Sequence, residues 1–223
     1  MDLSKSHEYF DPAKQKGRIH IIGCGSVGSA VAVLLARSGV TKFTLWDFDI
    51  VSPHNMANQM FRMQDVARNK AEALLDILCE INPDIAKDAK LKTEGWNGEN
   101  LSGFVFLCVD SIKTRREIAT SHLSATNVRA MFDFRTRLED AQHYAANWDD
   151  YTQKQNFVKS MNFTDEEADE ATPVSACGVT LGVCPTVWTI CAHGVANFMN
   201  FWNGKPLKTM VLDDIYGFTT DAI

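Results

Sequence analysis

The sequence lacks long hydrophobic runs, basic segments and low-complexity tracts. Its apolar stretches are too short to span a bilayer, and its N-terminal segment is polar, unlike a secretory signal peptide. The chain carries 22 basic and 28 acidic residues, a net charge of -6, so its surface as a whole does not attract nucleic acid or anionic lipid. We therefore expect a cytoplasmic protein that binds neither nucleic acid nor membrane.

Chain length and the positions of the cysteines further restrict the class of protein. At 223 residues, of which 45% are hydrophobic, the chain can bury a substantial core, and we expect a single domain spanning residues 1–223. The six cysteines lie mostly in apolar segments, where reduced thiols behave as small hydrophobic side chains. This usage is typical of a globular protein in a reducing compartment.

Hydrophobic patterning predicts alternating strands and helices in residues 1–135. Short apolar runs bounded by turn residues indicate strands, and apolar positions three and four apart indicate helices. The predicted strands are residues 18–22, 41–47, 85–93, 104–109 and 128–134. The predicted helices are one that includes residues 29–35 and stops at Ser38-Gly39, then 66–81 and 111–123. This alternation predicts a Rossmann-like α/β fold, a mainly parallel sheet flanked by helices.

The alternation stops after residue 135, and residues 136–223 are predicted to extend the sheet with strands of mixed direction. The expected elements are an extended strand at 138–148, a helix at 149–161, a solvated acidic stretch at 164–171, an irregular stretch at 172–185, a helix at 186–202 and an antiparallel edge strand at 208–215. We expect residues 1–135 to form a nucleotide-binding half, and 136–223 a crossover segment, the last helix and an edge strand.

A glycine-rich turn follows the first predicted strand. Gly23, Gly25 and Gly28 have the spacing G-x-G-x-x-G, a helix follows at once, and Asp47 ends the second strand. Glycines let the backbone approach a phosphate, a helix N-terminus presents unpaired N–H groups, and an acid accepts hydrogen bonds from ribose hydroxyls. In this order they predict a nucleotide site, whereas the glycines alone fit an ordinary strand-to-helix turn equally well.

Several motifs in sequence order resemble the ThiF/MoeB/HesA superfamily, the adenylating enzymes related to ubiquitin-activating enzyme. The motifs are GCGSVGS at the glycine turn, DFDIV at 47–51, HNMANQ at 54–59 in place of the family's S-N-L-x-R-Q, Lys70 on the next helix, Asn82-Pro83, and CVDS ahead of a helix that carries Arg115. Because these motifs are separate and correctly ordered, they are far more specific than the glycines alone.

The resemblance implies ATP and magnesium as ligands, and transfer of AMP to the C-terminal carboxylate of a ubiquitin-like or sulfur-carrier protein. By motif position, Asp47 would hold the ribose, Asn55 and Lys70 would contact phosphates, and Asp110 would hold magnesium. The implied nucleotide-binding set is Gly23, Gly25, Ser26, Gly28, Asp47, Asp49, Asn55, Asn58, Gln59 and Lys70, with Asp110 and Lys70 as catalytic residues. Taken singly, these residues fit helix caps, turn formers or exposed helix charges equally well.

The chain departs from the family pattern at three places. Asn58 stands where the family often has an arginine that faces the phosphates, and Arg62 is our candidate replacement. The arginine-rich N-terminal segment that in relatives reaches into the partner subunit's site is not recognisable in residues 1–17. The C-x-x-C pairs that bind zinc in some relatives are absent, so we expect no zinc.

Cys177 is the candidate for a second step. Some family members pass the activated carrier to a cysteine in the crossover segment, and Cys177 follows a Pro- and Ser-containing stretch and precedes a glycine. An irregular setting suits an accessible thiolate that attacks an acyl adenylate. The alternative is a buried, inert thiol, which is how we interpret Cys184 and Cys191.

These features favour an ATP-dependent adenylating enzyme that acts as a homodimer. Two alternatives stay open: an NAD-dependent oxidoreductase, for which the glycines and Asp47 suffice, and a non-catalytic nucleotide-binding scaffold, which Asn58 and the missing N-terminal arginine make credible. The oxidoreductase hypothesis explains neither Asn55 and Lys70 nor Asp110.

Overall fold

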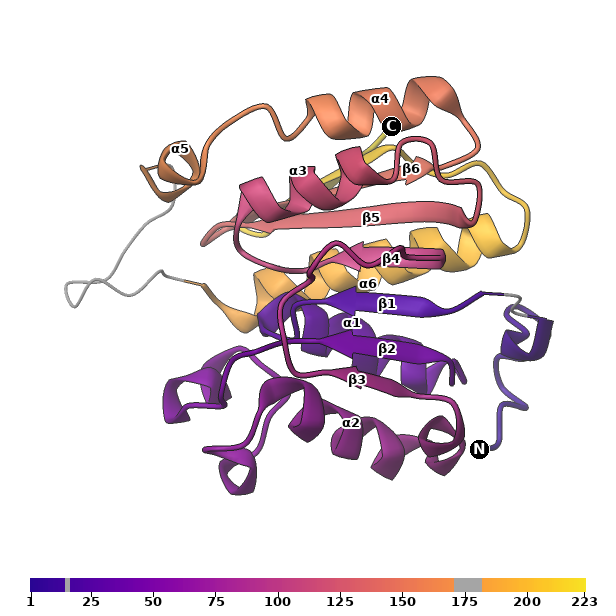
Figure 1. Ribbon diagram of the computed structural model, residues 1–223, viewed down its shortest axis with the longest axis vertical. Helices are drawn as coiled ribbons and strands as arrows, with labels where there is room; N and C mark the ends of the chain where they lie inside the picture. Colours follow the sequence, from indigo (N-terminus) through magenta and orange to yellow (C-terminus); the bar gives the residue numbers. More distant parts are fainter. Residues whose placement is uncertain (15–16, 171–181) are drawn as a thin grey trace.

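One sheet of eight strands organises the described part of the chain, residues 1–14, 17–170 and 182–223 of the computed structural model (Figure 1). The strands are β1 (Ile19–Ile22), β2 (Phe43–Trp46), β3 (Lys90–Lys92), β4 (Gly103–Leu107), β5 (Val128–Thr136), β6 (Asp140–Asn147), β7 (Met210–Asp214) and β8 (Thr219–Ala222), in the spatial order β3-β2-β1-β4-β5-β6-β7-β8. Pairing is parallel from β3 to β5 and antiparallel from β5 to β8. The predicted Rossmann-like α/β class with a mixed C-terminal extension is confirmed.

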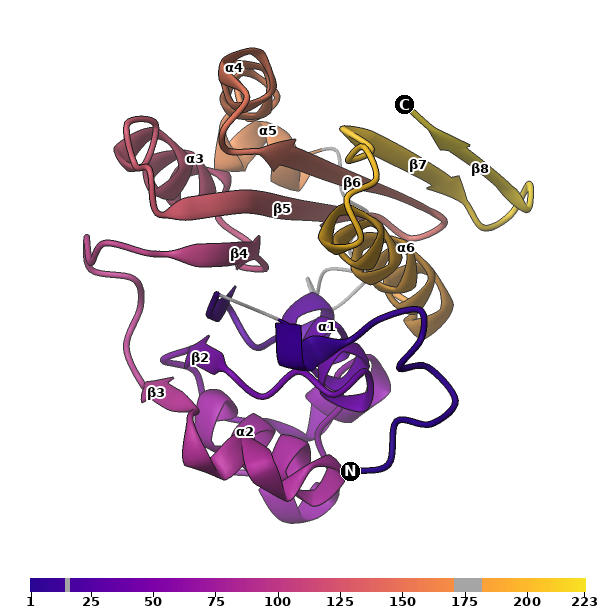
Figure 2. The ribbon, with the colours of Figure 1, turned by 90° about the vertical axis from the view of Figure 1, so that its right-hand side faces the viewer.

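Helices cover both faces of the sheet (Figure 2). They are α1 (Ser26–Arg37), α2 (Lys70–Ile81), α3 (Ile112–Ser121), α4 (Tyr151–Lys159), α5 (Asp165–Glu170) and α6 (Cys184–Trp202). The helices α1, α2 and α6 pack on one face, and α3 and α4 pack on the other. None of the helices in the described residues is long and apolar enough to cross a membrane.

The central strands are buried on both faces, which explains their continuous apolar sequences. All four residues of β1 are buried, and successive side chains point to opposite faces, so that Ile21 joins the core under α1 while Ile22 joins the core under α3. The side chains of β4 alternate in the same way. This double burial fixes the strand ends, and with them the loops that follow at the carboxyl edge of the sheet.

The structure corrects three details of the predicted elements. The second helix begins at Lys70 and not at residue 66, because Ala67 has a φ of 70° and the Asn69 side chain caps the N-terminus by accepting from Ala71 and Glu72 N–H. Most of the predicted strand 85–93 is not strand, since a 3-10 helix occupies Pro83–Lys87 and leaves only the short β3. The antiparallel strand β7 is not the sheet edge, because β8 pairs with its outer side.

Candidate functional site

A cavity of about 690 Å³ opens along the carboxyl ends of β2, β1, β4 and β5 and the start of β6. Its walls include Asp47 after β2, Lys70 at the start of α2, Asp110 after β4 and Arg137 after β5. In doubly wound sheets, ligands bind in this position because the loops that follow parallel strands meet at one edge.

The glycine turn forms the floor of this cavity. Gly23 has a φ of +92°, and a Cβ there would lie 2.8 Å from the carbonyl of Cys108. A Cβ at Gly28 would lie 1.9 Å from the carbonyl oxygen of Gly23, so α1 can pack this closely against the turn only with glycine at that position. The helix α1 starts at Ser26 beside the cavity, with no capping side chain and no acidic residue in its first turn. Its first N–H groups are therefore available to an anion.

Asp47 ties the end of β2 to the glycine turn. Its Oδ2 accepts the backbone N–H of Cys24 at 2.6 Å, and its Oδ1 accepts that of Asp49 at 2.8 Å. Burial raises the pKa of Asp47, while these two N–H groups and the nearby Lys70 oppose the rise. Carboxylate oxygens have further lone pairs, and because Asp47 lines the cavity, they remain usable by a ribose hydroxyl.

Lys70 supplies a buried positive charge in the cavity wall. Its Nζ donates to Asp49 Oδ2 at 2.9 Å, and its backbone N–H donates to Asp49 O at 2.9 Å. The N-terminal residue of α2 is therefore held against the loop after β2, which directs the ammonium group into the cavity.

Asp110 lies in the loop between β4 and α3. It is exposed, lines the cavity, and accepts the N–H of Ser111 at 3.0 Å. Mg²⁺ in nucleotide sites is held by one or two carboxylates together with substrate phosphates and waters. The exposed carboxylate of Asp110, in a cavity that the N-terminus of α1 also lines, fits that requirement.

The HNMANQ loop and Arg62 are arranged differently from the prediction. Asn55 is buried and accepts the N–H of Ser52 at 2.8 Å, and of this loop only Gln59 lines the cavity, whereas Asn55 and Asn58 do not. Arg62 pairs with Asp65 at 3.0 Å and with Glu80 at 2.6 Å and is not part of the cavity wall. The structure thus brings together Gly23, Gly25, Ser26, Asp47, Asp49, Gln59, Lys70 and Asp110.

Cys177 lies outside the described residues. Cys184 opens α6, and its thiol donates to the carbonyl of Ala57 at 2.8 Å. Cys191 is fully buried, and burial raises the pKa of its thiol, as it does for Cys108 on the cavity wall. Cys108 and Cys191 are thus held as neutral thiols.

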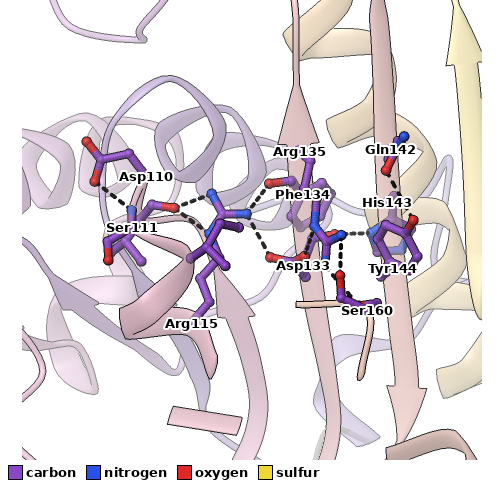
Figure 3. Close-up of polar contacts among 12 residues, drawn as sticks. Asp110, Ser111, Arg115, Asp133, Phe134, Arg135, Gln142, His143, Tyr144 and Ser160 are labelled. Atoms are coloured by element: carbon purple, nitrogen blue, oxygen red, sulfur yellow. Dashed lines mark hydrogen bonds and ion pairs between the residues drawn. The ribbon is translucent and has the colours of Figure 1, made fainter. Parts of the chain in front are cut away.

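A buried carboxylate between two arginines shapes the far end of the cavity (Figure 3). Asp133, fully buried on β5, accepts from Arg115 Nη1 at 2.8 Å and from Arg135 Nε at 2.8 Å. Arg115 also donates to the carbonyls of Val109 and Phe134, each at 2.6 Å, which joins the loop after β4 to β5. We did not predict this cluster as part of the site; the alternation of acid and arginine at the end of β5 was its only local signal.

Asp165 makes specific contacts within the acidic stretch 164–171, most of whose described residues are exposed, as predicted. Its Oδ1 accepts the N–H of Ile112 at 2.5 Å and that of Lys113 at 3.3 Å, and its Oδ2 accepts the hydroxyl of Ser111 at 3.0 Å. The carboxylate therefore caps α3 directly after Asp110. It places α5 over the far end of the cavity, where Glu167 and Asp169 line the wall.

The part of the cavity beyond Asp110 forms a distinct region, which we call the distal lobe. It is lined by Arg135, Thr136, Arg137, Asp140, Gln142, Phe163, Glu167 and Asp169. These residues come from the end of β5, the start of β6 and the segment around α5.

The sequence pattern of the ThiF family matches residues 11–193. Ubiquitin-like modifier-activating enzyme 5 of Arabidopsis thaliana is 38% identical over 71 residues, which is 32% of this chain and 16% of that protein. The enzyme of the same name from Oryza sativa subsp. japonica is 32% identical over 114 residues, 44% of this chain and 27% of that protein. The matches thus cover a small part of these relatives.

Solved structures agree on the fold. PaaA superposes with a TM-score of 0.71 at 15% identity, covering 100% of this chain and 74% of that one. Escherichia coli MccB with ATP superposes with a TM-score of 0.70 at 17% identity, covering 94% of this chain and 64% of that one.

Proposed function

The chain belongs to the ThiF family, and from that premise we propose that it is an ATP-dependent adenylyltransferase. Its proposed substrate is the C-terminal carboxylate of a ubiquitin-like or sulfur-carrier protein, which it converts to an acyl adenylate. The observation that carries the proposal is that Gly23 and Gly25 of the glycine turn line one cavity together with Asp47, Lys70 and Asp110. MccB, which shares the fold, has been crystallised with ATP.

The proposed binding residues follow one another along the carboxyl edge of the sheet. Asp47, at the end of β2, accepts hydrogen bonds from the ribose hydroxyls. The N–H groups at the N-terminus of α1 and the ammonium group of Lys70 bind the phosphates. The substrate carboxylate oxygen attacks the α-phosphorus, and the bond to the departing pyrophosphate breaks. Magnesium, held by Asp110, would neutralise the phosphate charge.

We propose that residues 1–135 form the nucleotide-binding half and that 136–223 receive the carrier, with Cys177 as acceptor if a thioester forms. We also propose a cytoplasmic homodimer.

A non-catalytic nucleotide-binding scaffold is the second candidate function. It is favoured by the position of Asn58 and by the engagement of Arg62 with Asp65 and Glu80, which leave the phosphate end short of arginine.

Ligand-dependent melting temperatures test the nucleotide proposal. We expect ATP with magnesium to raise the melting temperature of the full chain and NAD to leave it unchanged, because a ligand that binds only the folded state stabilises it. A shift with NAD and none with ATP would reject adenylation in favour of a dehydrogenase.

Pyrophosphate exchange then separates enzyme from scaffold. With a panel of purified ubiquitin-like and sulfur-carrier proteins, we expect one member to drive incorporation of labelled pyrophosphate into ATP. ATP binding without exchange by any member would favour the scaffold.

A further inference from the structure

We infer that Arg137 in the distal lobe binds the carboxylate of the second substrate. The inference rests on the proposed function and adds to it the residue that receives the acceptor. The cavity begins at Asp47, directly after β2, passes the ends of β1 and β4, and reaches β5 and β6. Neighbouring strands lie about 4.8 Å apart, so the distal lobe begins about 5 to 10 Å beyond Asp110.

The distal lobe therefore lies beyond the parts that hold ribose and phosphate. A molecule that reacts at the α-phosphorus must approach from a free side, and the lobe at β5 and β6 provides that side within the same cavity. The second substrate arrives as an anion, because its carboxylate is the nucleophile. A cation in the lobe is needed to hold it against the charge of the phosphates.

Four cations line the cavity within the described residues, and three of them are hydrogen-bonded to a carboxylate. Lys70 donates to Asp49, and both Arg115 and Arg135 donate to the buried Asp133. Arg135 is further fixed by Ser160, whose carbonyl and hydroxyl accept at 2.9 and 2.8 Å. These three side chains are therefore fixed parts of the cavity wall.

Arg137 is held much more loosely. Its Nη1 lies 3.8 Å from Asp140 Oδ1, and the two side chains are 51% and 47% exposed. That separation is an ion pair without a hydrogen bond, and exposed pairs of this kind contribute little stability. An incoming carboxylate can therefore replace Asp140 at small cost and form two parallel hydrogen bonds with the guanidinium.

Hydrogen bonds nevertheless fix the backbone around Arg137. Its N–H donates to the carbonyl of Asp140 at 2.9 Å, which closes the turn between β5 and β6. The buried Thr186 on α6 donates its hydroxyl to the carbonyl of Leu138 at 2.7 Å, which holds the tip of this turn on the fold. Arg137 thus combines a fixed backbone with a guanidinium that can accept a new partner.

Peptide binding tests the inference on the full chain. The probe is a fluorescein-labelled pentapeptide ending in Gly-Gly, compared with its C-terminal amide, by fluorescence anisotropy with and without a non-hydrolysable ATP analogue and magnesium. We expect the free acid to bind about tenfold more tightly than the amide, the magnitude of a charge-assisted hydrogen-bonded pair. Arg137→Gln should abolish this preference, and Asp140→Asn should increase it.

Controls separate this inference from the proposed function. Arg129→Gln removes the same charge from the exposed, opposite end of β5 and should keep the preference. Equal or undetectable binding of acid and amide by the wild type, or a preference that survives Arg137→Gln, would overturn the inference. Lower affinity of Arg137→Gln for the ATP analogue with an unchanged peptide preference would make Arg137 a phosphate ligand instead. Failure of the analogue to bind wild type would reject adenylation, while the measurement without nucleotide still decides the role of Arg137.

Discussion

The ammonium nitrogen of Lys70 lies 2.9 Å from a carboxylate oxygen of Asp49, with 10% of the lysine side chain exposed against 51% of the aspartate. The charge on the cavity wall is therefore preformed before any ligand binds. Because its partner is half exposed, the lysine can turn towards a phosphate while the carboxylate returns to solvent.

Replacing Lys70 by methionine should weaken binding of ATP with magnesium by about tenfold to a hundredfold, the usual contribution of a charge-assisted hydrogen bond. Isothermal titration calorimetry measures the change. Lys87→Met is the matched control, because Lys87 pairs with Asp84 on the surface and is 75% exposed. Equal affinities of wild type and Lys70→Met would remove Lys70 from the nucleotide site.

The glycine turn should respond differently at two of its positions. In Gly28→Ala the new methyl group would lie 1.9 Å from the Gly23 carbonyl oxygen, so we expect the free energy of unfolding to fall by about 3 kcal/mol or more. In Gly25→Ala the methyl group meets no heavy atom within 4 Å, so the fold should persist while ATP binding weakens at the helix end. Urea unfolding and ATP-dependent melting shifts check both. Wild-type stability of Gly28→Ala would contradict the close packing of α1 on the turn.

The carboxylate of Asp133 should be essential for stability. Asp133→Asn leaves the guanidinium groups of Arg115 and Arg135 without their buried anion, and breaking a buried pair costs about 3 to 5 kcal/mol. Urea unfolding measures this loss, with the exposed Asp149→Asn as the control for charge removal. A loss no greater than that of the control would show that the arginines find other acceptors.

The site residues that directly follow strands could be predicted from the sequence. Asp47 and Asp110 come directly after apolar strands, and because parallel strands end at one edge, their convergence on one cavity was predictable. Lys70 was predictable for its place on the helix that follows.

The rest depends on pairing between distant segments. Arg115 and Asp133 are 18 residues apart, and Asp165 caps a helix 53 residues before it, so no local periodicity marks either contact. The start of α2 was misplaced because Ala67 adopts a left-handed conformation that its identity does not favour.

Acid should destabilise the protein through His143. The ring is fully buried, its Nδ1 lies 3.1 Å from the carbonyl oxygen of Asp133, and its Nε2 lies 3.2 Å from Asn197 Nδ2. Asn197 Nδ2 also donates to the carbonyl of Lys208 at 2.8 Å, and its Oδ1 accepts the Lys208 N–H at 2.9 Å, which fixes the amide with its NH₂ group towards the ring. A neutral ring with its proton on Nδ1 satisfies both contacts, whereas a second proton on Nε2 would face a donor.

Burial lowers the pKa of His143 to about 4 from the ordinary value of 6.5. Between those two pH values the unfolded chain binds a proton that the folded chain does not. The stabilising contribution is therefore complete above pH 6.5 and is lost as the pH falls towards 4, by about 1.4 kcal/mol per pH unit.

Urea unfolding at several pH values measures this slope. His143→Gln should reduce it by about one proton, and the exposed His54→Gln should not. An unchanged slope in His143→Gln would mean that the ring is protonated in the folded chain.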